Sequence, residues 1–223
     1  MQRPGALEPR LAKPGGAVDS MTVYSLEGII PVVDPSSFVH PQATLIGDVI
    51  IGPRCYIGPG AALRGDMGRI VVGAGSNVQD NCVLHTFPAK EVRLEEDSHI
   101  GHGAVLHGCT VQRGALVGIN AVVMDDVVVG EQSLVGAASF VRAGFIVPPR
   151  TLVLGAPARV IRELTAEEIG WKAVGTREYQ ELTQRCLASL RECLPLPEAP
   201  RERASVSQKP VSTVPLHTLD RRK

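Results

Sequence analysis

Three of the six histidines are the residues most able to support chemistry in this chain: His85, His102 and His107. A neutral imidazole is a common ligand of zinc and a general base near neutral pH. A single histidine is more often a surface residue or a satisfied core residue. The positions of these three in the surrounding pattern must therefore decide their role.

That pattern has a period of six residues. Neither an α-helix, with 3.6 residues per turn, nor a β-strand, with a period of two, produces it. A hexapeptide β-helix does, because each repeat is a short strand plus a corner and three repeats close a triangular coil. We therefore predict an all-β fold, a parallel β-helix of about six coils, from the aliphatic positions Val39, Leu45, Ile51, Ile57, Leu63, Val72, Val78, Leu84, Leu94, Ile100, Leu106, Val111, Val117, Val123, Val129, Val135, Val141, Val147 and Val153.

The composition agrees with this repeat and restricts the function. Hydrophobic residues make up 44% of the chain but aromatic residues only 4%, which suits many narrow, similar layers. Lys plus Arg and Asp plus Glu are 23 each, a balance that argues against binding nucleic acid or an anionic membrane. We find no apolar run long enough to cross a membrane, no signal-peptide pattern and no CxxC pair among the five cysteines. These features predict a cytoplasmic protein.

Four regions follow from the chain. Residues 1–20 predict a flexible extension, residues 21–160 the β-helix, residues 161–194 a C-terminal α-helical segment and residues 195–223 a disordered tail.

In the helical segment, Thr165 and Glu168 form a capping-box pattern, and two glycines divide the segment into helices near 165–173 and 177–193. An apolar stripe is expected to lie on a coil face or on a neighbouring subunit; its members are Tyr179, Leu182, Cys186, Leu190 and Cys193. Tyr179 is also a weak candidate for the site.

The repeat register places the three histidines on two sides of the coil. His85 follows Leu84 and His107 follows Leu106, so these two occupy equivalent positions one coil apart, at about one inter-strand spacing. His102 lies on another side, stacked over Asp80. Because metal ligands must converge, we expect a neighbouring subunit to present its His102 to this pair, giving a homotrimer with three sites between subunits.

Three neutral imidazoles leave a metal one position open for water, whose pKa then falls to about 7 and which supplies a hydroxide nucleophile. Gln79 can hydrogen-bond this hydroxide or a substrate oxygen. Arg64 and Asp66 lie near Asp80 and can form an ion pair across the interface, or a surface pair of little energetic value.

The sequence resembles the γ-class carbonic anhydrase-like proteins. The segments that carry the resemblance cover Leu63–Asp66, Asn77–His85, His99–Cys109 and Leu154–Arg159, and the chain looks closest to the phenylacetic acid degradation protein Y group, which is related to the carnitine operon protein group.

The resemblance implies that the β-helix is left-handed and that the protein is a trimer. It also implies zinc, or another divalent metal such as iron or cobalt, bound by His85 and His107 of one subunit and His102 of the next. The active-site and interface residues that it implies are Arg64, Asp66, Gln79 and Asp80.

One loop departs from the family pattern. Established carbonic anhydrases of this family carry glutamates as proton shuttles, whereas here Met67 follows Asp66 and only Glu91 is acidic in the insertion after His85.

The first hypothesis is therefore a zinc-dependent acyl-CoA thioesterase, a hydrolase of phenylacetate catabolism. The alternatives are a carbonic anhydrase on the same site, a hexapeptide-repeat acyltransferase that uses one histidine as general base without a metal, and a non-catalytic assembly subunit.

Overall fold

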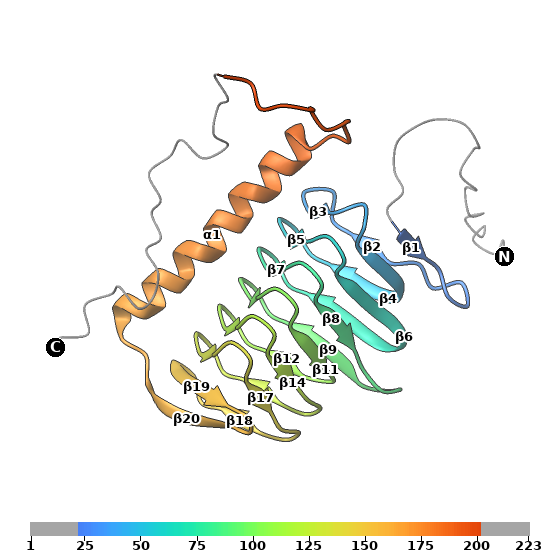
Figure 1. The fold of residues 1–223 in the computed structure, drawn as a ribbon. Coiled ribbons are helices and arrows are strands. Elements are labelled where there is room, and N and C mark those ends of the chain that lie inside the picture. The colour runs from blue at the N-terminus through green and yellow to red at the C-terminus, as the bar shows by residue number, and fades with distance from the viewer. Residues whose placement is uncertain (1–21, 202–223) are drawn as a thin grey trace.

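In the computed structural model, residues 22–201 are described, and they stack as triangular coils with one long helix along the outside (Figure 1). The predicted extension at 1–20 and most of the predicted tail at 195–223 lie outside these residues. The parallel β-helix is confirmed, with about seven turns in place of six. Val23 and Val33 pack against the core and belong to a first turn that the count from Val39 leaves out.

Each coil has three sides. The side that faces the helix is made of β3 (Phe38–Val39), β5 (Tyr56–Ile57), β7 (Asn77–Val78), β10 (His99–Ile100), β13 (Leu116–Val117), β16 (Leu134–Val135) and β19 (Thr151–Gly155). An antiparallel strand, β20 (Ala158–Glu163), closes its last edge.

A second side, called here the histidine side, contains β1 (Thr22–Tyr24), β8 (Val83–His85), β11 (Val105–His107), β14 (Val122–Val123) and β17 (Phe140–Val141). The third side contains β2 (Val32–Val33), β9 (Glu91–Leu94), β12 (Thr110–Val111), β15 (Val128–Val129) and β18 (Ile146–Val147). The longer strands β4 (Thr44–Ile51) and β6 (Ala62–Val72) pair with strands of both of these sides.

The core is a narrow column of aliphatic side chains from all three sides. All of the aliphatic positions that define the six-residue period are buried, and they stack in register, for example Leu106 between Leu84 and Val123. The small residues between them, such as Cys82 and Ala104, are fully buried at the corners. Burial of stacked aliphatic side chains is therefore what stabilises the coils.

The C-terminal segment forms one helix, α1 (Ala166–Ser189), so the prediction of two helices is wrong. The capping box at its start is present, with Thr165 and Glu168 bonding reciprocally. Gly170 and Gly175 each cost a helix up to about 1 kcal/mol, but contacts along the coils outweigh that cost. The helix runs back along the stack toward the first coils (Figure 1).

The predicted apolar stripe is not what fixes α1 to the coils. The buried residues of the helix are polar, namely Glu168, Lys172, Thr176 and Thr183. Lys172 donates to the Gly114 carbonyl, Gln180 to the Gly75 carbonyl at 3.0 Å and Thr183 to the Cys55 carbonyl at 3.4 Å.

Of the stripe, Tyr179 packs on the coils, while Leu190 and Cys193 are exposed. The reason is that α1 crosses the turns of successive coils, whose carbonyl groups need donors rather than apolar partners.

Within residues 22–201 no helix combines the length and the apolar character needed to cross a membrane.

Candidate functional site

His85 and His107 are neighbours on the histidine side, at equivalent positions of β8 and β11. Nδ1 of His85 lies 3.2 Å from Nε2 of His107. The other nitrogen of each ring faces a carboxylate: Nε2 of His85 is 3.0 Å from Asp66, and Nδ1 of His107 is 2.7 Å from Asp125. Arg64 extends the row, with its guanidinium 3.1 Å from the other oxygen of Asp66.

This row occupies every ring nitrogen of the pair. Each ring has one nitrogen against a carboxylate and the other against the neighbouring ring. No ring nitrogen of His85 or His107 is therefore left without a partner in this arrangement.

Asp125 was not among the predicted site residues. It belongs to the coil after His107, and its carboxylate fits because the position beneath it is Gly108. Gly108 has φ +53°, and a Cβ added there would collide with the Asp125 carboxylate. The sequence contains a signal for this contact, because Gly108 directly follows His107 and Asp125 occupies the equivalent region of the next coil. The exposed ring of Phe87 also covers His107 edge-on at 4.8 Å.

His102 lies apart from this pair, at a corner next to the helix-facing side. Its Nδ1 lies 3.0 Å from a carboxylate oxygen of Asp80, within ion-pair distance, and the two side chains are 44% and 39% exposed. A carboxylate beside Nδ1 favours the tautomer with the hydrogen on that nitrogen, which leaves the lone pair on Nε2; Nε2 makes no hydrogen bond within residues 22–201. Gly58 leaves room for Asp80, because a Cβ there would collide with its carboxylate.

Gln79 is buried beneath α1, where its amide is engaged by neighbouring side chains. Its amide donates to Asn77 at 2.9 Å and lies 2.7 Å from Nε2 of His99, beneath α1. His99 is the half-buried histidine that the sequence analysis left without a role, and it also contacts Thr176 and the ring of Tyr179. Burial lowers the pKa of His99 to about 4, with smaller effects from nearby cations, so the ring is neutral. This network positions α1.

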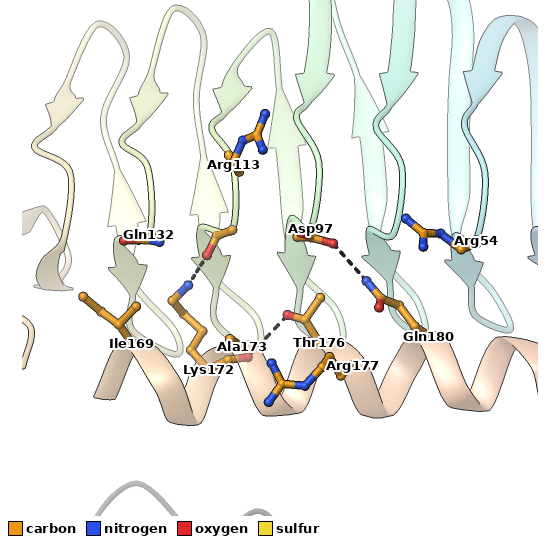
Figure 2. Close-up of a pocket in the computed structure, with 11 residues that line it drawn as sticks. Arg54, Asp97, Arg113, Gln132, Ile169, Lys172, Ala173, Thr176, Arg177 and Gln180 are labelled. Carbon is orange, nitrogen blue, oxygen red and sulfur yellow. Dashed lines mark hydrogen bonds between the residues drawn. The ribbon is translucent and has the colours of Figure 1, made fainter. Parts of the chain in front are cut away.

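Two cavities flank α1. The first, about 390 Å³, is called here the histidine pocket because His99 and His102 line it; most of its remaining wall is apolar, including Ile119, Leu134 and Trp171. The second, about 410 Å³, lies between α1 and the turns of the coils (Figure 2). Tyr179 lines only the histidine pocket.

Within one chain the predicted metal ligands do not converge, which agrees with the expectation that His102 would come from a neighbouring subunit. His85 and His107 face each other and their carboxylates, while His102 bonds Asp80 on a different side of the coil. Within residues 22–201 no group of three or more His, Cys, Asp and Glu side chains is arranged to hold a metal ion.

The fold and these residues define a hexapeptide-repeat protein. The bacterial transferase hexapeptide (six repeats) pattern matches residues 31–65. The chain belongs to the same family as the carnitine operon protein CaiE: it is 51% identical to CaiE of Salmonella agona (strain SL483) over 196 residues, which is 86% of this chain and 99% of that protein. The carnitine operon part of the resemblance is thereby confirmed, and the carbonic anhydrase part stays a prediction.

Two solved structures are similar in fold and sequence. A putative acetyltransferase from Bacillus cereus is 35% identical with a TM-score of 0.75, and covers 76% of this chain and 99% of its own. A hexapeptide transferase family protein from Anaplasma phagocytophilum is 37% identical with a TM-score of 0.71, and covers 74% and 98%.

These findings overturn the first hypothesis. The matching family and the similar structures are transferases, so the prediction of a zinc-dependent thioesterase, a hydrolase of phenylacetate catabolism, is wrong. The zinc cofactor, with iron or cobalt as substitutes, is corrected with it, because the matching family and the similar structures are transferases and no metal-holding group of side chains is present within residues 22–201. The physical reason is that histidines stacked on a wall can pair with one another and with carboxylates, as His85 and His107 do, without a metal ion.

Proposed function

We propose that this protein is an acyltransferase that moves an acyl group from an acyl-CoA thioester to a hydroxyl or amine acceptor, with His102 as general base. The observation that carries the proposal is the His102–Asp80 pair at the rim of the histidine pocket, with Nε2 of His102 free. The relationship to transferases supports the reaction class.

The geometry of His102 suits proton abstraction. Asp80 lies 3.0 Å from Nδ1, where its carboxylate favours the tautomer with the hydrogen on that nitrogen, and a carboxylate in that position stabilises the imidazolium that forms. The corner places the ring at the surface, where an acceptor can reach it. Of the three predicted histidines, it alone keeps an accepting nitrogen in this arrangement.

The histidine pocket suits the acyl donor. Its apolar wall of Ile119, Leu134 and Trp171 can hold a chain of methylene groups, and its volume of about 390 Å³ falls in the usual range of small-molecule sites. His99 and Gln79 line its floor, but their polar atoms are engaged with each other. They shape the pocket and are not proposed to react.

The reaction balances with these groups. The acceptor O–H or N–H gives its proton to Nε2 of His102 as its oxygen or nitrogen attacks the thioester carbonyl carbon. The tetrahedral intermediate then expels the CoA thiolate, which takes the proton from His102. The products are an ester or amide and free CoA.

A homotrimer is part of the proposal. On the histidine side, outward apolar residues stack in register beside the histidines: Val83, Val105, Val122 and Phe140. Val83 and Phe140 are 37% and 39% exposed in the single chain. Covering this stripe with a second copy would bury it and bring the His85–His107 pair opposite the His102–Asp80 pair of that copy.

In that arrangement the His85–His107 pair faces the reacting carbonyl, where its N–H groups can stabilise the negative charge that develops on the carbonyl oxygen. Asp66, Asp125 and Arg64 hold the pair in place. The described cysteines are all free, as suits a reducing compartment such as the cytoplasm.

The test is an acyl-transfer assay with acetyl-CoA and a panel of amine and hydroxyl acceptors, in which mass spectrometry detects the acylated acceptor. We expect His102→Asn to lower kcat by about 10²- to 10⁴-fold, the usual contribution of a general base. Asp80→Asn should lower kcat by a smaller factor. His40→Gln is the matched control, because His40 is a partly exposed histidine that bonds only its own turn.

Equal activity of the wild type and His102→Asn would overturn the assignment of the base. Release of CoA without an acylated acceptor, across the whole panel, would overturn acyl transfer itself.

A further inference from the structure

The second cavity lies on the other flank of α1 from the histidine pocket. Ala173 and Arg177 line it, whereas Gly175 and Tyr179 line the histidine pocket. Residues two positions apart on a helix project about 200° apart, so the two cavities open on opposite flanks. His102 does not line the second cavity.

Cationic side chains dominate its wall. Arg54, Arg113, Lys172 and Arg177 line it, against a single carboxylate, Asp97. Gln180 already donates to that carboxylate at 2.9 Å.

Arg113 contributes least to the cavity, because it pairs with Glu96 at 3.1 Å and points away from α1 in Figure 2. Arg54 and Arg177 have no ion-pair partner among residues 22–201. Two arginines are thus available to an anion.

Lys172 reaches the same space from beneath α1. It is nearly fully buried, and its ammonium donates to the Gly114 carbonyl, which uses one of three N–H groups. Burial lowers the pKa of Lys172 to about 8, so the side chain is still mostly charged at neutral pH. An anion in the cavity would give this buried charge the partner that it lacks.

The spacing of these cations indicates the size of the ligand. The turn that carries Arg54 and the turn at Gly114 are three coils apart, linked by hydrogen bonds through Gly75 and Asp97. At about 4.8 Å per coil, the backbone of Arg54 and the end of Lys172 are separated by roughly 14 Å, with Arg177 between them. One phosphate ion cannot contact both ends, whereas a nucleotide is an extended molecule that covers more of that length.

We propose that this cavity binds a nucleoside phosphate, with its phosphate groups held by neighbouring cations of the row Arg54, Arg177 and Lys172. The volume of about 410 Å³ admits a ligand of that size. Arginine forms bidentate hydrogen bonds with phosphate oxygens, which adds geometric selectivity to the charge. The inference does not depend on the proposed acyl transfer, since the cavity contains none of its reacting groups.

The test is isothermal titration calorimetry of the full chain with three probes: ADP, coenzyme A and inorganic phosphate. We expect saturable binding of ADP or coenzyme A at one site per chain, and binding of inorganic phosphate at least tenfold weaker. Arg54→Gln and Arg177→Gln should each weaken binding of the nucleotide by tenfold or more. Both residues are exposed, so these variants test the site without disturbing the core.

Arg69→Gln is the matched control, because Arg69 is an exposed arginine on β6 that pairs with Asp48 outside the cavity. Its affinity should stay within twofold of the wild type. Lys172→Met removes the buried charge, and circular dichroism establishes that it is folded before titration.

The proposal is overturned if no probe binds saturably, if Arg54→Gln and Arg177→Gln bind as the wild type does, or if inorganic phosphate binds as tightly as ADP. His102→Asn separates the two proposals. Nucleotide binding that persists in an inactive His102→Asn protein supports the cavity, whatever the outcome of the acyl-transfer assay.

Discussion

Acid should loosen α1 through one half-buried histidine, His99. His99 is neutral beneath the helix, and Nε2 accepts from the Gln79 amide at 2.7 Å. Protonation would place an N–H against the N–H of Gln79 at a half-buried position beneath α1. The folded state therefore resists protonation of His99.

The size of the effect follows from the pKa. Burial lowers the pKa of His99 from 6.5 to about 4. Between these values the unfolded chain binds more protons than the folded chain, so the free energy of unfolding falls as pH falls. At 1.36 kcal/mol per unit, the loss attributable to His99 is about 2 kcal/mol between pH 6.5 and pH 5, and roughly 3 kcal/mol by pH 4.

Urea unfolding at pH 7, 6 and 5 measures this loss at a fixed protein concentration. The single tryptophan, Trp171, lies on α1 beside the histidine pocket and reports on the helix by fluorescence. His99→Asn keeps a polar side chain that does not titrate in this range, so its pH dependence should be flatter than that of the wild type. His40→Gln controls for the loss of an exposed histidine.

The quantity compared is the slope of the free energy of unfolding against pH, since His99→Asn can lower stability at every pH. If the wild type and His99→Asn lose stability in parallel between pH 7 and pH 5, the assigned role of His99 is wrong.

Three further predictions concern stability. Leu106→Ala removes a fully buried side chain from the core column and should cost about 2–5 kcal/mol, measured by urea unfolding; a cost below 1 kcal/mol would contradict a close-packed column. Glu168→Gln should cost about 1–2 kcal/mol at pH 7, because the paired Arg162 guanidinium lowers the pKa of Glu168 to about 2. This contribution to the free energy of unfolding is present above pH 4.5 and is lost as pH falls toward 2. Equal acid sensitivity of the variant and the wild type would refute it. Gly108→Ala should lower thermal stability by about 1–2 kcal/mol through its positive φ and its collision with Asp125, and an unchanged melting temperature would exclude that clash.

The positions of the coils were predictable because the period of six is local. Each aliphatic residue is inward in its own repeat, whatever lies in the next coil, and stacking then follows from register. The same register predicts from the sequence alone that His85 lies beside His107, as it does in the structure. It missed Asp125 and His99, since their importance depends on which atoms meet across neighbouring coils.

The helix shows where sequence patterns stop being sufficient. An apolar stripe normally marks the buried face of a helix, and the stripe through Tyr179 and Cys186 led to that prediction. The coils present carbonyl groups at their turns instead, so Lys172 and Thr183 became the buried residues. Sequence alone does not reveal the polarity of a surface that another part of the chain creates.

By itself, then, the sequence determined a β-helix with a wall of stacked histidines, because a repeated local pattern fixes which side chains point outward. Only the tertiary structure decided which nitrogen of each ring stays free, where the two cavities lie and which cations face one of them. Those outcomes depend on contacts between residues far apart in the chain, and the repeat places no constraint on them.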